Sequence, residues 1–102
     1  MKIYLDDERV TPDGWHRTYT VRDTIALLET RTVIELSLDN DLGNNKPQGF
    51  TVLDWLEQMV YDDSTFPIPI VTIHSANPVR VKHMQRTMEA IYIIRQQQIG
   101  GG

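Results

Sequence analysis

The sequence predicts an α/β fold, in which a parallel sheet of about four strands carries helices, and three features support this prediction. Four short apolar segments, well separated along the chain, are typical of strands. Segments with helical periodicity follow the last three of them. The links between these segments are short, and strands that alternate with helices through short links usually form a parallel sheet with right-handed connections.

The predicted strands are rich in Ile, Leu, Val and Tyr. They span about residues 2–5, 17–20, 34–38 and 69–73. The first and the last two are almost continuously apolar, which is typical of strands covered on both faces. The segment between the first two, residues 8–15, contains Pro12, Asp13 and Gly14. These turn-forming residues predict a loop in place of a helix.

The predicted helices begin at recognisable capping residues. They span about residues 21–31, residues 52–62 and a segment from residue 78 onward. Thr20 with Asp23, and Thr51 with Asp54, both match the T-x-x-D box, in which the threonine caps the helix and the acid reaches back. Asn77 is expected to cap the third helix, because a proline follows it at the first helical position.

Composition limits the classes of protein to consider. The chain has 102 residues, no cysteine and a formal charge of −4. We expect one domain over residues 1–96 and a disordered tail over residues 97–102. The lack of cysteine excludes disulfides, thiolate metal sites and a cysteine nucleophile. The acidic balance argues against a protein that grips nucleic acid mainly by neutralising phosphates.

The expected location is the cytoplasm, without contact with a membrane. No apolar stretch approaches the ~18 residues that a membrane-spanning helix needs. The first residues turn acidic at Asp6 and contain no apolar signal-peptide region.

Acidic residues follow two of the predicted strands. Asp6 and Asp7 follow the first, and Asp39 and Asp41 end or follow the third. The carboxyl ends of neighbouring parallel strands lie only ~4.8 Å apart at one edge of a sheet, so these acids should converge. Two carboxylates ~4 Å apart repel by about 4 kcal/mol at an effective dielectric near 20, and such a cluster favours a cation. Because all the ligands are oxygens, the expected ion is Mg²⁺, with Mn²⁺ as the alternative.

Polar and basic residues follow the fourth predicted strand at the same edge. We expect Ser75 to donate a hydrogen bond, and His74 to act as an acid, a base or a phosphate contact. Asn77 opens a helix, and helix N-termini favour anions. Arg80 and Lys82 in its first turns extend that preference outward. Together with the predicted metal, these residues indicate a phosphate-bearing ligand.

The arrangement resembles the receiver domains of two-component signalling. The resemblance rests on the Asp6-Asp7 pair, on Asp39 at the end of a strand, and on Ser75 followed by an alanine. The segments LDDER, PDGW, SLDNDLG and HSAN are more specifically similar to the family of cyclic-phosphate-processing receiver domains. This resemblance covers about residues 1–96 and implies a compact, flavodoxin-like three-layer sandwich with strand order 2-1-3-4.

The chain also departs from the receiver pattern in two respects. A helix is missing after the first strand, and the fifth strand, which ends in an essential lysine in receivers, is absent from the predicted elements. Arg9, Arg80 or Lys82 are the candidates to replace that lysine. The resemblance also implies that the main-chain carbonyl of Asp41 completes the metal site.

What the resemblance implies is the processing of cyclic phosphates, such as RNA 2′,3′-cyclic phosphate ends or cyclic nucleotides. The implied site residues are Asp6, Asp7, Arg9, Asp39, Asp41, His74, Ser75 and Asn77. In a metal-dependent phosphoesterase, Arg9 and Ser75 would stabilise negative charge and His74 would protonate the leaving oxygen. Asp39 would serve as a metal ligand or as a nucleophile.

Two alternatives to an enzyme remain open. The first is a receiver-like switch that is phosphorylated on Asp39 without further chemistry. The second is a module that binds a phosphorylated ligand or a protein partner.

Overall fold

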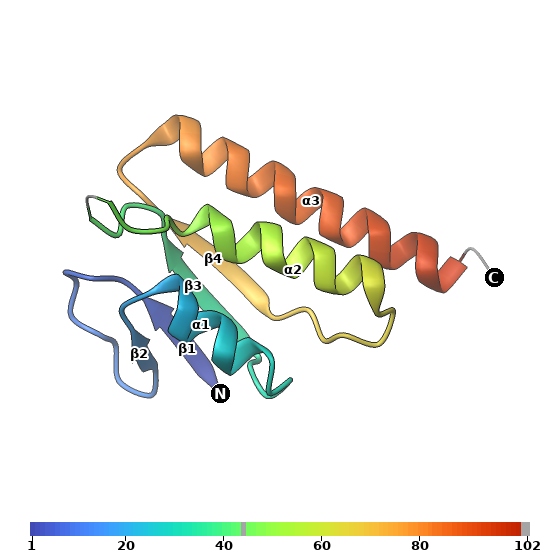
Figure 1. Ribbon diagram of the computed structural model, residues 1–102, viewed down its shortest axis with the longest axis horizontal. Coiled ribbons are helices and arrows are strands. Elements are labelled where there is room, and N and C mark those ends of the chain that lie inside the picture. Colours follow the sequence, from blue (N-terminus) through green and yellow to red (C-terminus); the bar gives the residue numbers. More distant parts are fainter. Residues whose placement is uncertain (44, 101–102) are drawn as a thin grey trace.

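The computed structural model describes residues 1–43 and 45–100, which form a sheet and a layer of helices (Figure 1). In chain order the elements are β1 (Lys2–Leu5), β2 (His16–Thr18), α1 (Val21–Leu28), β3 (Glu35–Asp39), α2 (Phe50–Asp62), β4 (Ile70–His74) and α3 (Pro78–Gly100). All strand pairs are parallel, and the order across the sheet is β2-β1-β3-β4. The predicted α/β class and strand order are therefore confirmed.

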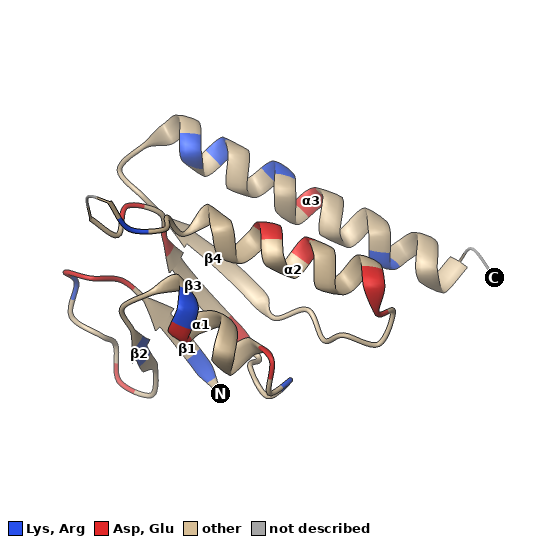
Figure 2. Cartoon of the chain, viewed as in Figure 1, with Lys and Arg blue, Asp and Glu red and all other residues tan. Residues whose placement is uncertain are grey.

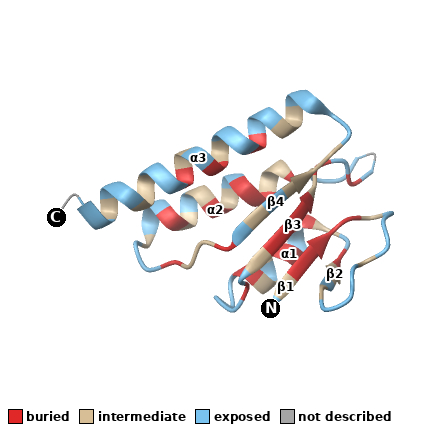
Figure 3. Cartoon of the chain, turned by 180° about the vertical axis from the view of Figure 1, so that it is seen from behind, coloured by how far each residue is buried: buried red, intermediate tan, exposed pale blue. Residues whose placement is uncertain are grey.

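The helices lie on one face of the sheet, as the view from behind shows (Figure 3). The connections from β2 to β3 and from β3 to β4 run in the same direction across the sheet. Right-handed connections therefore place α1 and α2 on the same face, and α3 packs along α2. A helix between β1 and β2 would cross in the opposite direction and cover the other face, but that link is a loop. The expected three-layer arrangement is therefore wrong for the described residues, which form two layers.

The core lies between the sheet and this helical layer. Ile3 and Leu5 of β1 are fully buried beside Leu36 and Leu38 of β3. The helices contribute the buried residues Val52, Leu53, Leu56, Val60, Met84, Met88 and Ile91. The packed core fixes the relative positions of the strand ends, where the acidic residues follow.

Two of the three predicted helix caps are confirmed. Thr20 Oγ1 accepts the backbone N–H of Asp23 at 3.1 Å. Asn77 Oδ1 accepts the backbone N–H groups of Val79 and Arg80 at 3.1 and 3.2 Å.

The predicted cap at Thr51 is wrong, because α2 begins one residue earlier, at Phe50. Gly49 occupies the N-cap position and makes no side-chain cap bond. The N–H of Phe50 instead donates to Asn40 Oδ1 at 3.1 Å. A side chain that follows β3 therefore caps α2 and ties the helix to the strand end.

These caps give a matched pair of substitutions. Thr20→Ala should lower the free energy of unfolding by about 1 kcal/mol, because it removes a cap bond. Thr51→Ala should change it by less than about 0.5 kcal/mol, because Thr51 lies inside the helix and caps nothing. Urea denaturation measures both values, and equal losses for the two variants would contradict the assignment of the caps.

The end of α3 also differs from the prediction. The helix continues through Gly100, so the tail predicted for residues 97–102 is wrong over residues 97–100, and residues 101–102 lie outside the described part. Gln98 Nε2 donates to the carbonyl of Val60 at 2.6 Å, and Arg95 donates to the carbonyl of Phe66. Glutamine is a good helix former, and these bonds hold the last turns against α2 and the loop after it. Among the described helices, none has the length and apolar character needed to cross a membrane.

Candidate metal and phosphate site

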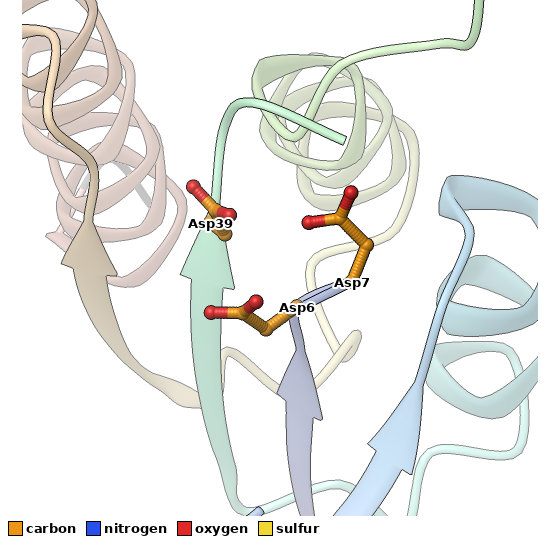
Figure 4. A group of neighbouring side chains, drawn as sticks. All are labelled: Asp6, Asp7 and Asp39. Atoms are coloured by element: carbon orange, nitrogen blue, oxygen red, sulfur yellow. The ribbon is translucent and has the colours of Figure 1, made fainter. Parts of the chain in front are cut away.

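Three carboxylates gather where β1 and β3 end (Figure 4). Asp6 and Asp7 follow β1, Asp39 is the last residue of β3, and each offers an oxygen within 4.8 Å of the others. They line a pocket of about 320 Å³. The other residues that line it are Glu8, Arg9, Asp41, Gly43 and Ala76. The structure thus brings three of the four predicted acidic ligands together, as the strand-end argument predicts.

Asp6 is the fixed member of this group. Its side chain is 1% exposed, Oδ1 accepts the backbone N–H groups of Glu8 and Arg9 at 2.8 and 2.9 Å, and Oδ2 faces His74 Nε2 at 3.0 Å. Burial raises the pKa of this carboxyl, but the bonds from Arg9, Glu8 and His74 together outweigh it and hold the pKa below its ordinary value. Asp6 is therefore a buried carboxylate that stays charged.

The negative charges of Asp39 and Asp7 have fewer stabilising partners than that of Asp6. Burial raises the pKa of Asp39, the bond that Oδ1 accepts from the N–H of Asp41 at 3.2 Å lowers it, and the charge of Asp6 raises it again. The net pKa of Asp39 lies above its ordinary value. Among the described residues, neither Asp7 nor Oδ2 of Asp39 has a hydrogen-bond partner. Three carboxylates therefore lie within 4.8 Å of one another, and the described residues give two of them, Asp7 and Asp39, little compensation for their negative charge.

Two arginines border the acids in different ways. Arg9 Nε lies 3.7 Å from Asp6 Oδ2, and its side chain is 62% exposed. At 3.7 Å the Arg9 Nε makes no hydrogen bond to this buried carboxylate, and most of the Arg9 side chain lies in solvent, so the guanidinium can turn toward a bound phosphate. Arg17 Nε donates to the carbonyl of Asp6 at 2.8 Å, and its Nη2 donates to the carbonyl of Arg9. Arg17 therefore holds the acidic turn in place.

His74 lies behind the acids, on the face of the sheet without helices. Its Nε2 meets Asp6, its Nδ1 meets Ser37 Oγ at 2.9 Å, and its ring stacks on Tyr4 with 5.1 Å between ring centroids. Because an ionised carboxylate only accepts, Nε2 carries the proton, and in the neutral ring Nδ1 accepts the Ser37 hydroxyl. His74 does not line the acidic pocket. In this arrangement it positions Asp6, and the expected proton donation to a leaving oxygen has no geometric support.

Sequence reasoning missed Ser37 and Arg17. Ser37 is a polar residue inside an apolar strand, on the same face as Tyr4 and in register with it. Arg17 is in register with Tyr4 on the other side of β1. For Ser37 the available signal was a polar residue that interrupts an apolar strand, whereas Arg17 lies in the polar strand β2 and gave no such signal.

Removal of the His74 ring tests its positioning role. His74→Ala should lower the free energy of unfolding by about 1–3 kcal/mol, because buried Asp6 Oδ2 loses its donor. The exposed His16 gives a matched control, and His16→Ala should change the value by less than about 0.5 kcal/mol. Urea denaturation at neutral pH measures both, and a His74→Ala variant as stable as the parent would contradict the role.

Ser75, Asp41 and Asn77 form a separate chain of hydrogen bonds beside the pocket. Ser75 Oγ donates to Asp41 Oδ2 at 3.3 Å and accepts the N–H of Asn77 at 3.1 Å. The Asp41 carboxylate lines the pocket but is outside the three-acid group, because it faces Ser75. The side-chain oxygen of Asn77 is already used in capping α3. A contribution from the main-chain carbonyl of Asp41 stays a prediction.

Basic residues gather on the first turns of α3 (Figure 2), but they do not line the acidic pocket. The Arg80 guanidinium lies over the Phe50 ring, 4.8 Å from the centroid. Lys82 lines a groove of about 540 Å³ with Glu57 of α2 and Arg86 of α3. Neither Arg80 nor Lys82 lines the acidic pocket, so their contact with a phosphate bound there stays a prediction without geometric support.

The donor set suits a hard divalent cation. Carboxylate oxygens are the ligands that Mg²⁺ and Mn²⁺ prefer, and the three-acid group provides them from two strands held by the core. Asp7, Asp39 and Asp6 are the residues that fit as ligands, and the exposed Arg9 lines the same pocket. This combination fits a phosphate bound next to a metal.

One of the comparisons with known proteins identifies a family. The family described as Cyclic-phosphate processing Receiver domain matches residues 1–90. No curated protein and no solved structure matches the chain. The matched segment includes the whole sheet, the three acids, His74 and the first turns of α3. The match and the receiver-like strand order together show that the chain belongs to the family of cyclic-phosphate processing receiver domains.

Proposed function

We propose that this chain is a metal-dependent phosphoesterase that acts on a cyclic or terminal phosphate, such as an RNA 2′,3′-cyclic phosphate end or a cyclic nucleotide. The observation that carries the proposal is the group of Asp6, Asp7 and Asp39, whose oxygens lie within 4.8 Å of one another in a pocket. Membership of a family described by cyclic-phosphate processing supports the substrate class.

The three acids would hold Mg²⁺ or Mn²⁺, which supplies Lewis-acid polarisation of a phosphoryl oxygen when it is bound. Arg9 would pair with the remaining negative oxygens, because its guanidinium is exposed and lines the same pocket. His74, Ser37 and Arg17 would keep Asp6 and the acidic turn in one position throughout the reaction.

Opening a cyclic phosphate consumes one water. A new bond forms from the water oxygen to phosphorus, one ring P–O bond breaks, and the released ribose oxygen gains a proton. In the covalent alternative, Asp39 Oδ2 attacks phosphorus, one ring P–O bond breaks, and the released ribose oxygen takes a proton from solvent while the nucleotide stays attached to Asp39 through its phosphate. Water then cleaves the bond between phosphorus and the aspartyl oxygen, releases the nucleotide and returns a proton to solvent. Oδ2 of Asp39, which accepts no hydrogen bond from the described residues, is available for either role, as ligand or as nucleophile.

The test is the hydrolysis of 2′,3′-cyclic AMP by purified protein in Mg²⁺, in Mn²⁺ and in EDTA, followed by chromatography. We expect adenosine monophosphate to form only with metal, and Asp7→Asn to abolish it. Asp54→Asn, which removes an exposed acid on α2, should retain full activity. Absence of turnover in both metals, or equal activity in the Asp7 and Asp54 variants, would overturn the proposal.

A receiver-like switch is the second candidate, and the free Oδ2 of Asp39 at the end of β3 favours it. Incubation with Mg²⁺ and acetyl phosphate should then add one phosphoryl group to the intact protein, and Asp39→Asn should prevent the addition. A stable phosphoryl adduct on a protein that does not hydrolyse 2′,3′-cyclic AMP would favour the switch. A protein that forms no adduct would exclude it.

A further inference from the structure

A second pocket, with apolar walls, lies beside the acidic one. It encloses about 330 Å³ and lies between the start of α1 and the loop after β3. Tyr19 and Val21 line it at the start of α1, and Leu42 and Pro47 line it from the loop after β3. Val21 and Leu42 are buried and belong to the core, whereas Tyr19 is 56% exposed. The pocket is therefore a fixed apolar recess with one aromatic ring at its surface.

The two pockets share the loop after β3 as a common wall. Gly43 lines the acidic pocket, while its neighbour Leu42 and nearby Lys46 line the apolar one. A Cβ added to Gly43 would lie 3.8 Å from Lys46 Cδ and 3.9 Å from Asp7 Oδ2. Gly43 has a φ of +102°, a backbone conformation that glycine adopts without strain. The two pockets are therefore neighbours along this loop.

Arg17 joins the two pockets from the other side. Its guanidinium lies 4.8 Å from the centroid of the Tyr19 ring, and the same side chain donates to the carbonyl of Asp6. One face of the Tyr19 ring is thus covered by a cation that also holds the acidic turn. Tyr19 lines the apolar pocket as well, so one side chain, Arg17, contacts both the ring in this pocket and the turn that carries the acids.

We propose that the apolar pocket takes the base of a nucleotide whose phosphate occupies the acidic pocket, and that Tyr19 stacks on that base. The inference rests on the proposed function, which places a phosphate at the three acids. A flat apolar heterocycle matches the apolar walls and the aromatic ring. Arg22 and Lys46 are the charged residues that line this pocket, and both are basic, so no acidic side chain there would repel an anionic nucleotide. The substrate class is then a nucleotide or an RNA end, in preference to a phosphate ester without a base.

The experiment compares two phosphomonoesters by isothermal titration in Mg²⁺: adenosine 3′-phosphate, and glycerol 2-phosphate, which lacks a base. We expect the nucleotide to bind about tenfold more tightly, in line with the loss seen when a stacking ring is removed. Tyr19→Ala should remove that advantage, and Tyr19→Phe should keep it. Tyr61→Ala gives the matched control, because Tyr61 is 69% exposed near the end of α2, away from the pocket.

The outcomes separate this inference from the proposed function, because hydrolysis of 2′,3′-cyclic AMP is measured on the same preparations. Equal affinities for the two esters, or equal effects of the Tyr19 and Tyr61 variants, would overturn the base pocket even if hydrolysis occurs. Tight, Tyr19-dependent binding without hydrolysis would support the base pocket and overturn the phosphoesterase. Failure of both esters to bind would overturn the base pocket.

Discussion

Replacing Gly49 by alanine is expected to destabilise the protein by about 3 kcal/mol and to disrupt the acidic group as well. A Cβ at position 49 would lie 2.0 Å from the carbonyl oxygen of Asp39 and 2.9 Å from Cα of Asn40. Both atoms belong to the main chain, so the clash cannot be relieved by turning a side chain. The N–H of Gly49 also donates to the carbonyl of Asn40 at 2.9 Å. The backbone that must move is therefore the segment that carries Asp39.

Chemical denaturation measures the loss, and metal titration of the folded variant measures the damage to the site. Gly100→Ala is the control, because a Cβ there meets no atom within 4 Å, and it should change the free energy of unfolding by less than about 0.5 kcal/mol. A Gly49→Ala variant as stable as Gly100→Ala would contradict the close contact between α2 and the end of β3.

Asp39→Asn is expected to have the opposite effect and to stabilise the metal-free protein by about 1–2 kcal/mol at neutral pH, because it removes repulsion between neighbouring carboxylates. Asparagine keeps the side-chain oxygen that accepts the N–H of Asp41. The Asp6 and Asp7 oxygens lie within 4.8 Å of an Asp39 oxygen, so most of the relief comes from these two contacts.

The pH dependence of this effect follows from the raised pKa of Asp39. The raised pKa means that ionisation is disfavoured in the folded state, so the parent loses stability as pH rises through that pKa. Below the ordinary value of 3.8 the carboxyl is protonated in both states, and the advantage of asparagine should disappear. Thermal unfolding in EDTA between pH 3 and pH 7, with Asp54→Asn as control, measures the difference. An Asp39→Asn variant less stable than the parent at neutral pH would show that the acids do not repel.

Much of the fold could be predicted from local patterns. The apolar strands and the turn residues at Pro12 and Gly14 gave the element order, and strand-helix alternation gave the parallel sheet. The prediction of three layers was wrong. A strand that is apolar on both faces need not have a helix on each face, because other side chains can cover one of them. Tyr4 is buried by the rings of Trp15 and His74, with 6.3 and 5.1 Å between centroids, on the face without helices.

The position of the three acids could be predicted, because it depends on where the strands end. The contacts of individual side chains could not be predicted, because they depend on the direction in which each side chain points. The convergence of Asp6, Asp7 and Asp39 follows from the parallel register alone. The direction of His74 toward Asp6 depends on Ser37, which lies far from it in the sequence. Likewise, the cap on α2 comes from Asn40, ten positions before Phe50, so no local motif could reveal it.

The most direct test of the central claim, that Asp6, Asp7 and Asp39 form a divalent-cation site, is isothermal titration of the metal-free protein with Mg²⁺. We predict saturable binding at one site in the parent and in Asp54→Asn. Asp39→Asn should bind at least about tenfold more weakly, because it loses one charged ligand. Absence of saturable binding in the parent, or the same affinity in the parent and in Asp39→Asn, would contradict the claim.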